Sequence, residues 1–212
     1  MSDVINLVSR HHALQTLGKA SQPHFLSVEF LGVSSKVPIS VTLVNREGIP
    51  IVSTPVCPGT DLTEKERKSA DNRGYDVSNL GDFPEIRDVL KYIAYRTSGL
   101  AVWVWEPEPI RVLLADHLDD RCKLQLNSLK NRLLPLFPDT EYNLKPTISS
   151  VMQLLDVQCQ RQKLHRSPEQ ANALRMIYLQ AQNMTVWELL GGTETLPFTS
   201  IIPEWARGGL SE

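Results

Sequence analysis

The sequence predicts an α/β protein in which a mixed β-sheet is flanked by helices. Three short runs rich in β-branched and apolar residues follow one another at residues 25–31, 38–45 and 49–54, as expected for a strand followed by a hairpin. A nearly continuous apolar run at residues 100–105 follows a helical pattern, which is typical of an interior strand covered on both faces. The order is a helix, three strands, a helix, a strand and several helices. This order favours antiparallel hairpin strands beside a central parallel strand.

The composition is that of an ordinary globular protein. The chain is 42% hydrophobic and 22% charged, and its 212 residues suit one α/β domain or one domain with a small appendage. The net charge of −2 gives no overall basic field that would attract nucleic acid. The three cysteines are far apart and form no C-x-x-C pair, so neither a disulfide framework nor a zinc site is predicted. The pattern at the start of the sequence predicts no signal peptide, and no apolar run reaches membrane-spanning length. We therefore expect a cytoplasmic location without membrane attachment.

The first half of the chain contains two expected helices besides its strands. Apolar residues at helical spacing predict a helix over residues 3–20, within an N-terminal region of residues 1–22. Residues 59–83 form a polar connector, and the mixed charges at 63–69 suggest a short exposed helix. Pro84 is expected to be the first residue of the next helix, because proline is favoured at that position.

Helices dominate the second half. The prolines at residues 107 and 109 end the strand at 100–105, and helices are expected from residue 110, over 121–135 and over 147–155. The clearest helix spans residues 167–184. Ser167 fits the N-cap, Pro168 the first position, and Gln170 would complete a capping box.

Residues 23–190 are therefore expected to form the main domain. The last segment, residues 191–212, is an irregular tail that contains several large apolar residues. A solvated tail does not need such residues, so we expect it to pack on the domain or on a partner.

One residue is out of place in this pattern. Glu29 lies between Val28 and Phe30 in an otherwise apolar strand, although glutamate is rarely buried unless it is paired or binds something. From the pattern alone, we expect Glu29 on an edge strand, with its side chain in water.

Several short segments resemble a known family when they are taken in order. The first strand reads Ser27-Val28-Glu29, apolar strands and a helix follow, and His165 stands five residues before Gln170. This arrangement, over roughly residues 24–184, resembles the DEDD superfamily of 3′–5′ exonucleases with a histidine general base, which have a ribonuclease H-like fold. That family has Asp-x-Glu in the first strand, an aspartate after the central strand, and a His with an Asp five residues later. Here Ser27 and Gln170 stand where the resemblance places two of the other acids, and the third would fall at Pro109 or Ile110. Glu29 and His165 remain.

The resemblance therefore implies the fold but argues against the activity. Two-metal nucleases hold two Mg²⁺ ions about 4 Å apart, and magnesium requires hard anionic oxygen ligands. One carboxylate, a serine and an amide do not provide them, so no cofactor is expected. Mg²⁺ or Mn²⁺ would bind only if other acids rebuilt the site, and Glu108 is the best candidate. The alternative is that Glu106 and Glu108 lie in an exposed loop, that His165 is a surface residue, and that Gln170 belongs to the capping box.

A second group of residues is suited to single-stranded nucleic acid. Trp105 could stack a base at the mouth of the cleft, and Arg161, Lys163 and Arg166 adjoin His165, where they could contact phosphates. Core packing for the tryptophan and a solvated rim for the cations are the other interpretations.

Three functions fit these observations. The first is a catalytically inactive exonuclease-like domain that binds single-stranded nucleic acid, a protein or a nucleoprotein complex. The second is an active metal-dependent exonuclease with a rearranged site. The third is an interaction protein that docks through its C-terminal tail.

Overall fold

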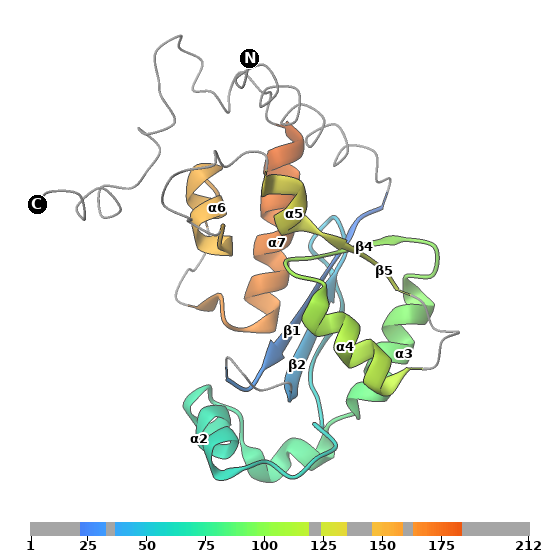
Figure 1. Ribbon diagram of the computed structural model, residues 1–212, viewed down its shortest axis with the longest axis vertical. Coiled ribbons are helices and arrows are strands. Elements are labelled where there is room, and N and C mark those ends of the chain that lie inside the picture. Colours follow the sequence, from blue (N-terminus) through green and yellow to red (C-terminus); the bar gives the residue numbers. More distant parts are fainter. Residues whose placement is uncertain (1–21, 33–36, 119–123, 135–145, 159–162, 184–212) are drawn as a thin grey trace, which may run out of the picture.

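The computed structural model describes residues 22–32, 37–118, 124–134, 146–158 and 163–183, and these contain a five-stranded mixed sheet (Figure 1). The strand order is β3-β2-β1-β4-β5, in which β2 runs antiparallel to both β1 and β3, whereas β4 is parallel to β1 and β5. The predicted fold class is confirmed, and the sheet is consistent with a ribonuclease H-like fold. The strands are β1 (His24–Phe30), β2 (Pro38–Val44), β3 (Pro50–Pro55), β4 (Ala101–Val104) and β5 (Gln125–Ser128).

Helices cover both faces of this sheet. One face packs against α5, α6 and α7, and the opposite face packs against α3 and α4 (Figure 1). The short helices α2 and η1 form a connector between β3 and α3. The bounds are α2 (Glu64–Asn72), η1 (Val77–Asp82), α3 (Ile86–Arg96), α4 (Glu108–His117), α5 (Leu129–Leu133), α6 (Ile148–Leu154) and α7 (Ser167–Asn183).

Side-chain alternation along β1 divides the core into two layers. Phe25 points toward α7, where Tyr178 packs edge-on against it with ring centroids 5.2 Å apart. Its neighbours Leu26 and Val28 belong to the opposite layer, with the apolar residues of α3 and α4. Trp103 lies in the same layer as Tyr178, at a centroid distance of 5.2 Å. β1 is thus an interior strand that is buried on both faces.

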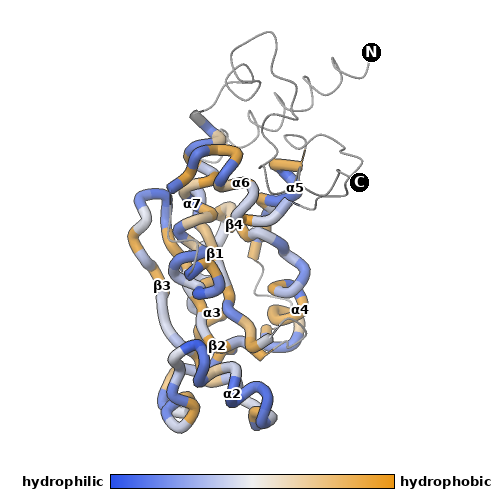
Figure 2. The backbone as a smooth tube through the Cα atoms, turned by 90° about the vertical axis from the view of Figure 1, so that its left-hand side faces the viewer, coloured by the Kyte–Doolittle hydropathy of each residue, from blue (hydrophilic) through white to orange (hydrophobic). Residues whose placement is uncertain are grey.

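The connector has a small core of its own. Leu31 and Ile39 pack with Ala70 and Leu80, so the connector is attached to the ends of β1 and β2. Its helix α2 is strongly hydrophilic and lies at one end of the molecule (Figure 2). The prediction of a short exposed helix here is confirmed, although α2 extends beyond residue 69.

Two sequence predictions about element boundaries are wrong. The range 121–135, expected to be one helix, contains strand β5 followed by the short helix α5. The sequence of residues 125–128 is too short to distinguish a strand from a helix. Their parallel pairing with β4 makes them a strand. Pro84 is not the first residue of α3, because α3 begins at Ile86 and Glu85 is extended, in a parallel bridge with Cys57 in which the Cys57 amide donates to the Pro84 carbonyl.

Several predictions concern residues outside the described ranges. These are the helix over 3–20, most of the N-terminal region 1–22, and the tail 191–212, together with the domain boundary at residue 190. Within the described ranges, no helix is long and apolar enough to span a membrane.

The aromatic cluster gives a direct test of the core. Tyr178 is fully buried between Phe25 and Trp103, so we expect Tyr178→Ala to lower the free energy of unfolding by about 3–5 kcal/mol, as large-to-small core substitutions do. Tyr95→Ala is the matched control, because Tyr95 is 78% exposed and should change stability by less than about 0.5 kcal/mol. Urea denaturation measures both, and a similar loss in the two variants would contradict this packing.

Candidate functional site

A strip of polar side chains runs along the face of β1 and β2 that packs against α7. Ser27 and Glu29 lie on the same side of β1 as Phe25, and their antiparallel partners are Thr42 and Ser40 on β2. All four are at least 96% buried. The strip therefore continues the apolar layer as a buried polar layer, and buried polar groups need partners.

Glu29 is the only acidic residue of the described part of the chain whose side chain is buried as a whole, and both of its oxygens are bonded. Arg73 Nη1 lies 3.2 Å from Oε1, and the Tyr75 hydroxyl donates to Oε2 at 2.8 Å. The expectation of a water-facing glutamate on an edge strand is wrong, because β1 lies between β2 and β4 and the residue is only 3% exposed.

The turn after α2 brings both partners to Glu29. The amide of Gly74 bonds the Asp71 carbonyl and that of Tyr75 bonds the Ala70 carbonyl, so the chain reverses at once. Gly74 has a φ of +80°, a conformation that side-chain-bearing residues rarely adopt. This reversal lets both Arg73 and Tyr75 point back at β1.

The two partners contribute differently to the site. Arg73 places a permanent positive charge beside a carboxylate that has lost its water, and its Nη1 also donates to the Phe30 carbonyl at 2.8 Å. Burial raises the pKa of Tyr75 to about 12, and the hydrogen bond to Glu29 adds to this shift. Tyr75 therefore stays a neutral donor over the physiological range.

The start of α7 is bonded to the same strip. The Ser27 hydroxyl donates to Gln170 Oε1, and the Ser167 hydroxyl lies 2.7 Å from that of Ser40 and 2.9 Å from that of Thr42. Ser167 is the first helical residue and is fully buried. The predicted capping box is thus wrong, since both of its side chains bond to the sheet instead of the helix backbone.

Ser27 and Gln170, two residues that stand where the resemblance places acids, are thus hydrogen-bonded to each other. The first turn of α7 also contacts the connector, because Arg166 Nη2 donates to the Arg73 carbonyl at 3.2 Å. Hydrogen bonds thus tie α7 to β1 and β2, and tie the connector to β1 and to the start of α7. We call the side chains of these neighbouring groups the polar network: Ser27, Glu29, Ser40, Thr42, Arg73, Tyr75, Ser167 and Gln170.

The acids near the expected second motif are engaged elsewhere. Pro109 is an exposed residue in the first turn of α4, and Glu108 beside it pairs with Arg111. Glu106 pairs with Lys130 in a pocket between the start of α4 and the segment of β5 and α5. In the described parts of the chain, no group of three or more acidic, histidine or cysteine side chains is close enough to hold a metal ion.

The remaining predicted site residues lie at the surface or in the core. His165 and Lys163 are exposed in the turn before α7, and Arg166 is exposed but bonded to the connector. Trp105 is half-buried and packs against the core layer of α7. Arg161 lies outside the described residues. Arg73 and Tyr75 were missed because the segment 72–76 indicates only a turn.

The bonds of the polar network link secondary-structure elements to one another. Its single carboxylate has a guanidinium as counter-charge, and its other members are hydroxyl and amide groups that bond to one another. Such a donor set does not fit a pair of divalent cations, which need several anionic oxygens free to coordinate.

The buried ion pair predicts an asymmetric mutational response. Arg73→Met should lower the free energy of unfolding by about 3–5 kcal/mol, because it leaves the Glu29 carboxylate buried and uncompensated. Adding Glu29→Gln should recover a large part of that loss. As a control, Lys68→Met breaks the exposed pair with Glu64 on α2 and should change stability by less than about 1 kcal/mol. Additive effects at residues 29 and 73 in a double-mutant cycle would contradict the pairing.

The raised pKa of Tyr75 predicts that the free energy of unfolding depends on pH in alkaline solution. Its pKa is higher in the folded chain than the ordinary value of 10, so its contribution to stability is complete below about pH 10 and is lost as pH rises toward 12. We expect the free energy of unfolding to fall more steeply over this window in the wild type than in Tyr75→Phe. Urea denaturation between pH 9 and 12 measures the difference, and parallel curves would show that the hydroxyl is not buried beside Glu29.

The sequence matches no protein-family model, and no curated protein is significantly similar to it.

Proposed function

We propose that this chain is a catalytically inactive exonuclease-like domain that acts as a binding module. The observation that carries the proposal is the state of Glu29, whose two carboxylate oxygens are held by Arg73 and Tyr75 in a buried site. In the family that the sequence resembles, the corresponding glutamate holds metal.

Charge supports this proposal. A two-metal phosphodiesterase gathers several carboxylates around two dications, which clamp the attacking and leaving oxygens. Here the positive charge beside Glu29 comes from a side chain, and a guanidinium neither activates water nor offers an open coordination position. The positions of the other acids hold Ser27, Pro109 and Gln170, all neutral.

The position of His165 also supports it. A histidine general base must reach the water that it deprotonates, directly or through one more water. His165 is exposed, and the neighbouring Arg166 is bonded to the backbone of the connector. Without a metal-bound water, the imidazole has no activated nucleophile to serve.

The exposed cations beside α7 and a nearby tryptophan support a binding role. The exposed cations Lys163 and Arg166, with Trp105, are the proposed contacts for single-stranded nucleic acid, and a protein or nucleoprotein complex is the other class of partner. The fold alone does not decide between them.

A nuclease assay tests the loss of catalysis. The full chain is incubated with 5′-labelled single-stranded DNA or RNA and Mn²⁺, beside Glu29→Ala and His165→Ala. We expect no shortening from the 3′ end above background in any sample. Shortening by the wild type that both substitutions abolish would overturn the proposal, and Glu108→Ala would then test whether that acid is a substitute ligand.

A gel shift on the same strands tests the binding partner. A nucleic-acid contact through Lys163 and Arg166 predicts an affinity that falls steeply between about 50 and 200 mM salt and falls again in Lys163→Gln. Affinity that does not depend on salt, or no shift at all, would exclude nucleic acid and leave a protein as the partner.

A further inference from the structure

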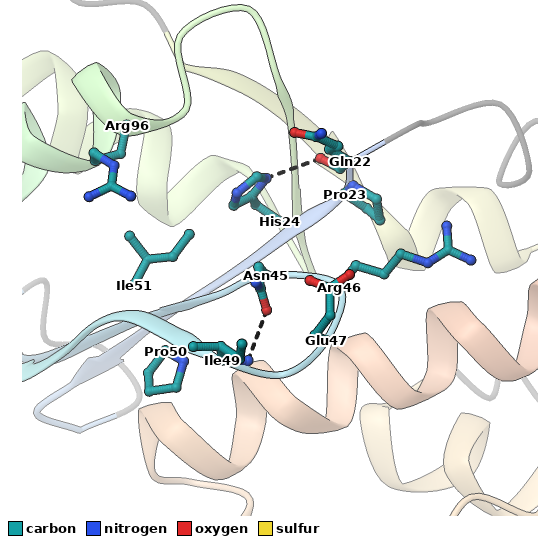
Figure 3. A pocket seen from close by; sticks show the side chains of 10 residues that line it. All are labelled: Gln22, Pro23, His24, Asn45, Arg46, Glu47, Ile49, Pro50, Ile51 and Arg96. Carbon is teal, nitrogen blue, oxygen red and sulfur yellow. Dashed lines mark hydrogen bonds between the residues drawn. The ribbon is translucent and has the colours of Figure 1, made fainter.

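A second polar site lies at the opposite end of β1 from Glu29. A pocket of about 550 Å³ opens where the start of β1, the β2–β3 hairpin and the end of α3 come together (Figure 3). Its volume is within the range of small-molecule sites. The lining residues are Gln22, Pro23, His24, Asn45, Arg46, Glu47, Ile49, Pro50, Ile51 and Arg96.

The imidazole of His24 is fixed in one tautomer. Its Nδ1 lies 3.0 Å from the Gln22 carbonyl, which is only an acceptor, so Nδ1 carries the hydrogen and a neutral ring has a bare acceptor at Nε2. His24 is 7% exposed, and no bond to Nε2 is found in the described part of the chain. The ring therefore offers the pocket a fixed acceptor for a hydroxyl or N–H group.

Arg96 is held in place without being neutralised. Its Nη1 donates to the Tyr92 hydroxyl at 2.7 Å, and the guanidinium lies over the Tyr92 ring, 5.6 Å from its centroid. Among the described residues it has no carboxylate partner. The tyrosine thus restricts the side chain while the positive charge and the other N–H donors stay available for an anion.

The remaining walls complete the site. Asn45 is oriented by a bond from the Ile49 amide to its Oδ1 at 2.8 Å, which leaves its amide N–H groups as donors. Ile49 is 61% exposed and, with Ile51, gives the pocket an apolar wall. Figure 3 shows Arg96, His24 and Ile51 around one space, whereas Arg46 points away from His24. Glu47 is the only carboxylate in the lining, and it is exposed.

We infer that this pocket binds a phosphate monoester that carries a hydroxyl group, of the size of a nucleoside monophosphate. The phosphate lies on Arg96 and the Asn45 amide, a hydroxyl donates to His24 Nε2, and the apolar part rests on Ile49 and Ile51. Each polar group is already oriented by a bond that uses only part of its capacity, so little ordering is needed on binding. The inference does not rest on the proposed function, because no residue of the polar network lines this pocket.

Calorimetric titration of the full chain tests the site. A nucleoside 5′-monophosphate should bind saturably, and the same nucleoside without phosphate should not. Arg96→Gln should weaken the affinity at least about tenfold, because a charge-assisted contact is lost. Arg87→Gln is the matched control, since Arg87 is an exposed arginine of the same helix that does not line the pocket, and it should bind as the wild type does.

A second variant tests the histidine. His24→Phe keeps an aromatic ring but removes both ring nitrogens and thus the acceptor, so it should weaken binding of the monophosphate, while a thermal melt checks that the variant folds. Absence of saturable binding to the monophosphate would overturn the inference. So would binding that Arg96→Gln leaves unchanged, or that Arg87→Gln weakens equally.

The same titration separates two sources of the phosphate. A short oligonucleotide with a 5′-phosphate is compared with its 5′-hydroxyl form and with the monophosphate. Tighter binding of the phosphorylated strand assigns the pocket to the end of a nucleic-acid strand. Equal or weaker binding than that of the monophosphate assigns it to a free small molecule.

Discussion

The burial of one carboxylate constrains much of the arrangement around the sheet. A glutamate on an interior strand must have partners, because an unpaired buried charge costs several kcal/mol. Arg73 and Tyr75 can meet Glu29 only if the connector turns back at Gly74 and lies against the end of β1. The position of α2 and η1, and through Arg166 the start of α7, is therefore tied to this ion pair.

Most of the fold could be predicted from the sequence because its patterns are local. The β-branched runs fix β1 to β3, and the apolar run before two prolines fixes β4. Strand β5 could not be predicted, because four residues carry little periodicity and its pairing with β4 depends on residues more than twenty positions away. The start of α3 is set by a bond from Cys57 to Pro84, which is equally non-local.

The candidate site could be predicted only in part, for the same reason. The capping-box pattern predicted that Gln170 would bond to the helix backbone, whereas its side chain bonds to Ser27 on β1. The partners of Glu29 lie more than forty positions along the chain, in a segment with no signal beyond a turn. His24 and Arg96 are ordinary residues in the sequence, and only the packing of α3 beside the hairpin brings them to one pocket.

Strand β3 has a consequence for how the molecule meets other copies of itself. Within the described residues β3 is an edge strand, and the free backbone groups of an edge strand are a template for intermolecular pairing and aggregation. Pro50 and Pro55 stand at its two ends, and a proline has no N–H to donate to an added strand. A strand from another molecule could therefore pair with only the four residues between these prolines. This short edge disfavours extension of the sheet from one molecule into the next.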